Sequence, residues 1–136
     1  MNITVSQAQG RVPVTVIQLE GQMDGQNYHD LIDKAQELFK TGARDFLLDL
    51  SQLTYISSAG LVALHSVALL ASGETPPDTS QGWKAMKDMD RGKQAGTQKH
   101  VKLLNPKPEV GSVLEMVGFT QMFDIFSDKD KALKSF

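Results

Sequence analysis

Apolar and polar residues alternate along the N-terminal part of the chain. The alternating apolar residues are Ile3, Val5, Val12, Val14 and Val16. Gly10 and Arg11 stand between the two runs and are typical of a turn. A period of two residues indicates strands with one buried face. The pattern therefore predicts two antiparallel strands, over about 2–8 and 12–19.

The next segment has the period of a helix. Its apolar residues fall on one stripe, and they are Leu31, Ala35, Leu38 and Phe39. Asp30 and Asp33 lie near the expected start and Lys40 near the expected end, as the helix dipole favours. Gly42 follows as a stop signal. An amphipathic helix that ends before Gly42 is predicted.

A short apolar run and a second helix follow. Phe46–Leu50 is nearly uninterrupted, which is typical of a central strand covered on both faces. We expect residues 51–57 to form a loop and Ser58 to open a helix that ends near Gly73. The apolar face of that helix contains Leu61, Leu64, His65, Ala68 and Leu69. Strand, helix, strand, helix is the order that builds a sheet with helices packed on it.

The composition changes between Gly73 and about Gln98, where glycine and proline appear and large aliphatic residues vanish. This segment is predicted to be a loop or a mobile arm. Trp83, Met86 and Met89 are three residues apart in a basic context. Two interpretations stay open: an amphipathic segment that docks on an acidic groove, or a disordered loop whose tryptophan rests on the domain's own surface.

The C-terminal part resumes the core pattern. Val101–Leu104 predicts a brief strand, and Phe123–Phe126 predicts an edge strand. Between them lies a helix stripe that Gly118 ends, formed by Val110, Val113, Leu114 and Val117. A short terminal helix, with Ala132 and Leu133 facing inward, is expected last. The whole pattern predicts one α/β domain over 1–136, with a mixed sheet of about four or five strands and about four helices.

Composition narrows the possible functions. The 136 residues contain no cysteine, which excludes disulfides, thiolate metal sites and cysteine nucleophiles. The net charge of −2 gives no field that would attract nucleic acid or an anionic membrane. The first residues lack a secretory signal, and no apolar run reaches the roughly 18 residues of a membrane span. We therefore expect a soluble cytoplasmic protein without nucleic acid as its partner and without membrane insertion.

Three motifs can be distinguished in the chain. The first is Asp49–Leu61, the second is Gly21–Asp24, and the third begins at Asn105-Pro106 and ends at Gly118-Phe119. Together they resemble the STAS domain, which is shared by anti-sigma factor antagonists and the cytoplasmic tails of sulfate transporters. The resemblance covers nearly the whole chain except roughly 73–98.

The resemblance implies a bacterial signalling domain that binds an anti-sigma factor serine kinase. Ser58 matches the family's phosphoacceptor: the unmodified form captures the kinase and releases a sigma factor, and a phosphatase resets the cycle. Ser57 stands where many relatives have an aspartate, which makes it a second candidate acceptor. The expected partner-binding residues are Asp24, Tyr55, Ile56, Ser57, Ser58 and Gly60. Tyr55 and Ile56 would offer apolar contact.

The chemistry of a helix start is compatible with such a switch. A serine at the N-cap faces backbone N–H groups that lack intrahelical partners, and a phosphate adds about −1.5 to −2 of charge there. We expect Asp24 to lie close to Ser58 on the same surface. Two alternatives remain. Ser58 is only a helix cap, or the chain is an unphosphorylated STAS adaptor of a membrane transporter or of a stress-sensing scaffold.

A catalytic role is not expected. Ile56 precedes Ser58 where a nucleophile elbow needs glycine, and His65 lies about 10 Å further along the helix axis, too far to act as a base. His29, His65 and His100 lack the spacing of metal ligands. We therefore expect no enzyme activity, no metal and no cofactor, while weak self-association stays open.

Overall fold

A computed structural model describes residues 1–72 and 98–136 of the chain. The described helices and strands are, in chain order, β1 (Asn2–Gln9), β2 (Pro13–Met23), α1 (Tyr28–Lys40), β3 (Phe46–Ile56), α2 (Ser58–Ala71), β4 (Val101–Leu104), α4 (Pro108–Met116), α5 (Phe119–Met122), β5 (Ile125–Phe126) and α6 (Lys129–Lys134). The arm expected at 73–98 lies outside the described residues, apart from Gln98.

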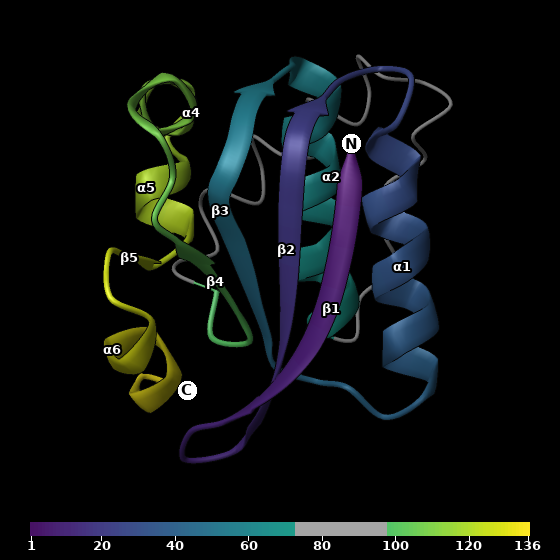
Figure 1. The fold of residues 1–136 in the computed structure, drawn as a ribbon, viewed down its shortest axis with the longest axis vertical. Helices are drawn as coiled ribbons and strands as arrows, with labels where there is room; N and C mark the ends of the chain where they lie inside the picture. Colours follow the sequence, from purple (N-terminus) through teal and green to yellow (C-terminus); the bar gives the residue numbers. More distant parts are fainter. Residues whose placement is uncertain (73–97) are drawn as a thin grey trace.

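The strands form one five-stranded sheet in the order β1-β2-β3-β4-β5 (Figure 1). β1 pairs antiparallel with β2, and the pairs β2–β3, β3–β4 and β4–β5 are parallel. The predicted α/β class, with a mixed sheet, is confirmed. Because β2, β3, β4 and β5 run in one direction, their carboxyl ends share one edge of the sheet and their amino ends share the other.

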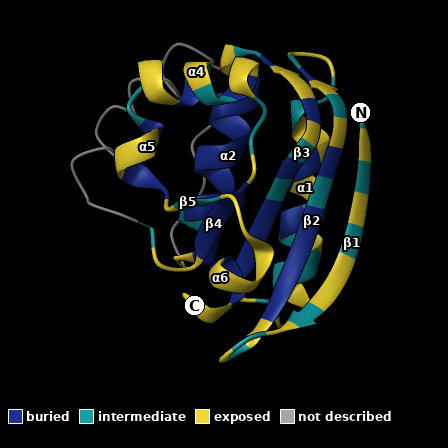
Figure 2. Cartoon of the chain, turned by 60° about the vertical axis from the view of Figure 1, so that its left-hand side comes forward, coloured by how far each residue is buried: buried dark blue, intermediate teal, exposed yellow. Residues whose placement is uncertain are grey.

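Both faces of the sheet are covered, but unequally. The helices α1 and α2 lie side by side on one face, with a large core in which Ile17, Leu19 and Leu48 from the sheet meet Leu31 and Leu64. On the other face, α6 closes a smaller cluster, and Figure 2 shows the position of α6 beside the sheet. That cluster consists of Val14, Val16, Leu47, Leu104, Ala132 and Leu133. Alternate residues of one strand thus serve two separate cores.

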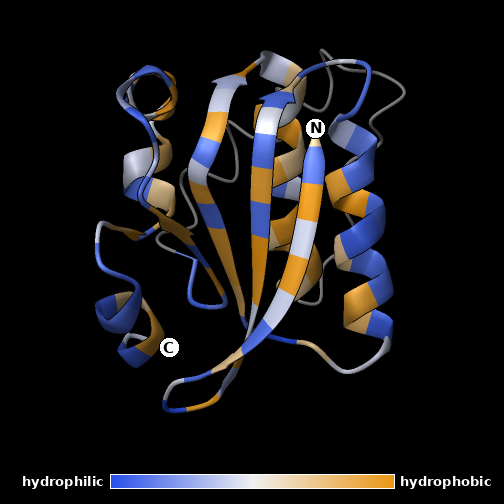
Figure 3. Ribbon diagram, viewed as in Figure 1, coloured by the Kyte–Doolittle hydropathy of each residue, from blue (hydrophilic) through white to orange (hydrophobic). Residues whose placement is uncertain are grey.

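The two long helices differ in how much of their surface is covered. α1 buries Leu31, Ile32 and Ala35 and keeps a polar outer face, as its stripe predicted. α2 is buried on nearly all sides from Gly60 to Ala68. Figure 3 shows hydrophilic segments along α1. It also shows the alternation of hydrophobic and hydrophilic residues along β1. A helix that is apolar all round is enclosed by the rest of the domain, so its N-terminus is held in a fixed place.

The prediction of a loop over residues 51–57 is wrong for every residue except Ser57. β3 continues to Ile56 and stays paired with β2, through Gln52 with Glu20 and Ile56 with Met23. Two irregularities in the β2–β3 register, after Gln18 and after Gly21, break the simple alternation of this part of the sheet. Because of these bulges, β3 stays paired with β2 although its apolar and polar residues no longer alternate regularly.

The C-terminal elements follow the expected order with one addition. Gly118 has φ of +81°, a left-handed conformation that favours glycine, and it separates α4 from α5. α5 is a single turn, which explains why the pattern predicted about four helices. β5 is an edge strand as expected, and Ala132 and Leu133 of α6 are buried. Within the described residues, none of the helices has the length and apolar character of a membrane span.

Candidate functional site

The first two motifs meet at the carboxyl ends of β2 and β3. Met23 and Ile56 are register partners, and the backbone N–H of Ser57 donates to the carbonyl oxygen of Met23 at 2.9 Å. This hydrogen bond joins the last residue of β2 to the residue before α2, and Figure 1 shows the ends of β2 and β3 at the same edge of the sheet. The structure therefore brings Gly21–Asp24 and the serine pair to one edge of the sheet.

Ser57, and not Ser58, caps α2. Ser57 has extended backbone angles, φ −91° and ψ 177°, and its Oγ accepts a hydrogen bond from the N–H of Gly60 at 3.4 Å. Ser58 is the first helical residue. The expectation that Ser58 is the N-cap is corrected, because the extended conformation of β3 persists through Ser57 and the helix turn begins one residue later.

The Ser58 side chain has no role in this cap. Ser58 is exposed, while Ser57 is half-buried and Gly60 is buried. Among the described residues, no side-chain hydrogen bond of Ser58 is present. Its hydroxyl is therefore open to solvent at a helix N-terminus, where backbone N–H groups and the helix dipole favour negative charge.

Replacing each serine in turn should separate the two roles. Ser57→Ala removes the cap acceptor and is expected to lower the free energy of unfolding by about 1 kcal/mol. Ser58→Ala removes an exposed hydroxyl and should change that free energy by less than about 0.5 kcal/mol. Urea unfolding followed by circular dichroism measures both. A larger loss for Ser58→Ala than for Ser57→Ala would contradict the assignment of the cap.

The loop after β2 has its own network of hydrogen bonds around Asp24. One Asp24 carboxylate oxygen, Oδ1, accepts from the backbone N–H of Gln26 at 2.9 Å. The backbone N–H of Asp24 donates to Asn27 Oδ1 at 2.9 Å, and Asn27 Nδ2 donates to the carbonyl oxygen of Gln22 at 2.8 Å. Sequence reasoning missed Asn27, although the run Asp24-Gly25-Gln26-Asn27 has a recognisable turn composition. The network fixes the conformation of the loop that begins directly after Met23, the residue whose carbonyl oxygen accepts from Ser57.

Gly60 lies where α2 approaches the ends of β2 and β3 most closely. A Cβ atom on Gly60 would be 2.6 Å from Ile56 Cγ1 and 3.2 Å from the carbonyl oxygen of Met23. Real side chains do not tolerate the shorter distance, so the absence of a side chain at this position permits the packing. The spacing between the serine pair and the β2 loop thus depends on this glycine.

Two neighbouring residues of the first motif face opposite ways. Tyr55 is 51% exposed, which makes it one of the large exposed apolar side chains of the described surface. Ile56 is 3% exposed and belongs to the main core. The expectation that Ile56 offers apolar contact to a partner is wrong, because its side chain packs in the main core against the first turn of α2, next to Gly60. Any apolar contact here comes from Tyr55.

No catalytic constellation accompanies the serine pair in the described residues. His65 is buried within α2, seven positions after Ser58. In residues 1–72 and 98–136 no cluster of three or more His, Cys, Asp or Glu side chains is able to hold a metal ion. His29 stacks on Tyr28 with ring centroids 4.0 Å apart, and His100 precedes β4. The three histidines therefore lie on separate elements, as their spacing indicated.

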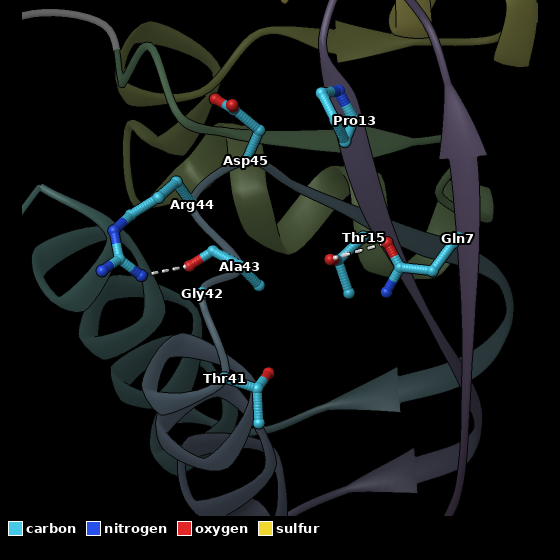
Figure 4. Close-up of a pocket in the computed structure, with 8 residues that line it drawn as sticks. All are labelled: Gln7, Pro13, Thr15, Thr41, Gly42, Ala43, Arg44 and Asp45. Carbon is cyan, nitrogen blue, oxygen red and sulfur yellow. Dashed lines mark hydrogen bonds between the residues drawn. The ribbon is translucent and has the colours of Figure 1, made fainter.

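A hollow of about 490 Å³ lies at the other end of the sheet, between the β1–β2 pair and the segment after α1 (Figure 4). Its one arginine, Arg44, donates from Nη1 to the carbonyl oxygens of Phe39 and Ala43, both at 2.8 Å. The Arg44 guanidinium also stacks on the Phe39 ring at 3.9 Å. These contacts give Arg44 a structural role at the end of α1, so this hollow is not the site that the motifs define.

The fold is similar to those of several solved structures. An anti-sigma factor antagonist from Mycobacterium paratuberculosis superimposes with a TM-score of 0.65 at 15% identity, covering 98% of this chain and 93% of that one. A Thermotoga maritima protein assigned the same role gives a TM-score of 0.71 at 14% identity, covering 97% and 92%. The Bacillus cell fate determinant SpoIIAA in its phosphorylated form gives 0.52 at 16% identity, covering 96% of each chain.

Sequence comparison identifies the family. No curated protein matches this chain. Residues 6–76, slightly more than half of the sequence, match the family described as "Mlab, STAS domain". The matched region contains the β2 loop with Asp24, the serine pair and Gly60, which are the residues that the structure brings to one edge of the sheet. The chain therefore belongs to the STAS domain family.

Proposed function

We propose that this protein is an anti-sigma factor antagonist whose unmodified form binds an anti-sigma factor serine kinase and whose Ser58-phosphorylated form is released. One observation carries the proposal: Ser58 is exposed at the first turn of α2, while the neighbouring Ser57 supplies the cap. The structural relatives described as antagonists support the same role, and one of these antagonists, SpoIIAA, has been solved in both its unphosphorylated and its phosphorylated form. A phosphatase restores the binding form, and the cycle takes place in the bacterial cytoplasm.

Electrostatics supply the switch. A phosphate on Ser58 adds about −1.5 to −2 of charge beside the β2 loop that holds Asp24. The helix N-terminus partly accommodates this charge, so the fold need not change. The partner surface, to which Asp24, Tyr55 and the serine pair contribute, gains a group that repels a carboxylate and disrupts an apolar contact. Binding is lost by altered contact and not by unfolding.

The test is capture of the kinase by variants of Ser58. Wild type and Ser58→Ala are expected to bind an anti-sigma factor serine kinase equally, whereas Ser58→Asp binds it roughly tenfold more weakly or worse. Phosphate should map to Ser58 by mass spectrometry after incubation with kinase and ATP. Ser112→Asp, on the exposed side of α4, adds the same charge elsewhere and is the matched control.

The alternative is an unphosphorylated STAS adaptor of a membrane transporter or of a stress-sensing scaffold. It stays in the test because the matching family is described by Mlab and not as an antagonist. Its expected result differs clearly. All Ser58 variants would retain the same transporter or scaffold subunit, and neither Ser58 nor Ser57 would carry phosphate, which would overturn the proposed switch.

A further inference from the structure

A polar pocket lies at the amino edge of the sheet, opposite the serine pair. Asp45, His100 and Asp124 each directly precede a strand, β3, β4 and β5 respectively. Because these strands are parallel neighbours, the three side chains reach the same edge. They line a pocket of about 480 Å³, which falls in the range of about 300–1,000 Å³ for small-molecule sites. Its walls include Val12, Asp45, His100, Lys102, Asp124 and Phe136.

Lys102 supplies a buried charge to this pocket. It is the register partner of Leu47, so its side chain points to the α6 face of the sheet. That side chain is 6% exposed, and its Nζ lies 5.9 Å and 5.4 Å from the ring centroids of Phe126 and Phe136. The two rings compensate part of the ammonium charge through cation–π contacts, and the rest depends on the hydrogen bonds that the ammonium donates.

The ammonium of Lys102 has more donors than the protein uses. Lys102 Nζ donates to Asp124 Oδ2 at 3.0 Å, and among the described residues this carboxylate is its one hydrogen-bond acceptor. A lysine has three N–H donors. The remaining two are available to the pocket that Lys102 lines. The Asp124 side chain is 48% exposed, so solvent weakens its compensation of the lysine charge.

The charges and apolar walls of the pocket define the ligand. Asp45 Oδ1 lies 2.9 Å from His100 Nδ1, and Asp124 is paired with Lys102. Lys99 also lines the pocket, so its two lysines and two acidic residues leave no net charge that would favour a ligand with two negative charges, while Lys102 can still bind a single one. Val12 and Phe136 offer apolar surface beside it. We propose that this pocket binds a small organic carboxylate with an apolar body.

In this site the ligand carboxylate accepts hydrogen bonds from Lys102 Nζ, and the apolar body lies against Phe136 and Val12. Charge-assisted hydrogen bonds of this kind are the stronger ones in proteins. The site does not depend on the proposed switch, because Ser57 and Ser58 lie at the carboxyl edge of the sheet and the pocket lies at the amino edge. A small carboxylate is thus a second, separate input to the domain.

The test uses benzoate as the probe, with acetate and inorganic phosphate as comparisons, added to the full ¹⁵N-labelled chain. We expect benzoate to shift the backbone amides of Gln98, His100, Lys102 and Phe136 in a saturable way and to leave Ser57 unchanged. Acetate should bind more weakly because it lacks the larger apolar body. Phosphate should bind more weakly than benzoate because it lacks an apolar body and the pocket has no net charge that would favour its second negative charge.

Two variants separate the contributions. Lys102→Met should weaken benzoate binding roughly tenfold or more while the domain stays folded, since methionine fits a buried linear site. Lys34→Met, on the exposed face of α1, is the matched control and should leave binding unchanged. Phe136→Ala should weaken benzoate more than acetate, and it tests the site without touching the buried charge.

Each opposing result would overturn the inference. These are the absence of saturable shifts with either carboxylate in the wild type, equal binding by Lys102→Met and wild type, or tighter binding of phosphate than of benzoate. If Lys102→Met fails to fold, the Phe136→Ala variant decides. An unchanged ratio of benzoate affinity to acetate affinity in that variant would overturn the inference. Loss of kinase binding in the Ser58 variants bears on the proposed function alone and does not enter this test.

Discussion

Gly60→Val is expected to lower the free energy of unfolding by about 3 kcal/mol, the upper end for an overpacked core. The first added atom alone would lie 2.6 Å from Ile56 Cγ1 and 3.2 Å from the Met23 carbonyl oxygen. Valine adds two further carbon atoms at the place where α2 meets the ends of β2 and β3. Relief requires α2 to move away from Met23, which would stretch the Ser57 to Met23 hydrogen bond. Urea unfolding measures the loss.

Gly111→Ala in α4 is the matched control for this substitution. A Cβ atom at Gly111 has nothing within 4 Å, so the only change is the gain in helix propensity. That variant should be more stable than wild type by up to about 1 kcal/mol. A loss of stability for Gly60→Val and a gain for Gly111→Ala would show that the close packing around Gly60 causes the loss, and not the replacement of a helical glycine as such. Wild-type stability of Gly60→Val would refute the close approach.

Phe119→Ala should destabilise the domain by about 3–5 kcal/mol. Phe119 is fully buried at the start of α5, and its ring meets the Phe123 ring edge-on with centroids 5.5 Å apart. Removing it leaves a cavity between the C-terminal helices and the main core, to which Leu114 also belongs. Such a loss is comparable to the whole stability of many small domains. Thermal unfolding should therefore show a much lower midpoint.

Met116 provides the contrast within the same segment. It lies three residues before Phe119, at the end of α4, but its side chain is 83% exposed. Met116→Ala should change stability by less than about 0.5 kcal/mol. Equal losses for the two variants would mean that the C-terminal helices are packed differently from this arrangement.

The elements that the sequence predicted well are those with regular periods. The α1 stripe, the β1–β2 alternation and the βαβ order were sufficient to predict the mixed α/β sheet. β3 was predicted too short because Ser51, Gln52 and Thr54 interrupt its apolar pattern. Pairing with β2, which has the same length of 11 residues, carries the strand through these residues, and pairing between distant segments has no local sequence signal.

The cap of α2 was predicted to within one residue. Two adjacent serines before an apolar run fit either cap position equally well, and only the backbone angles of Ser57 decide between them. The exposure of Tyr55 and the burial of Ile56 follow from the length of β3, which the pattern did not reveal. Asn27 was missed because its role depends on two backbone groups of the β2 loop.

The amino-edge pocket could not be predicted at all. Lys102 lies within an apolar run, and a lysine in such a run indicates an edge strand with that side chain in solvent. In the structure only 6% of the Lys102 side chain is exposed. Asp45, His100 and Asp124 are separated by long stretches of chain and meet only because their strands are parallel neighbours. A site assembled in this way becomes visible only once the topology is known.

The separate roles of Ser57, which caps α2, and Ser58, the proposed phosphorylation site, have a consequence for protein turnover. Since Ser57 caps α2 and the Ser58 hydroxyl makes no hydrogen bond within the described residues, modification of Ser58 breaks no hydrogen bond of the native state. On the proposed function, modified and unmodified molecules then have similar resistance to proteolysis and similar lifetimes. The cell would set the ratio of the two forms through kinase and phosphatase activity alone, and selective degradation would not erase the signal.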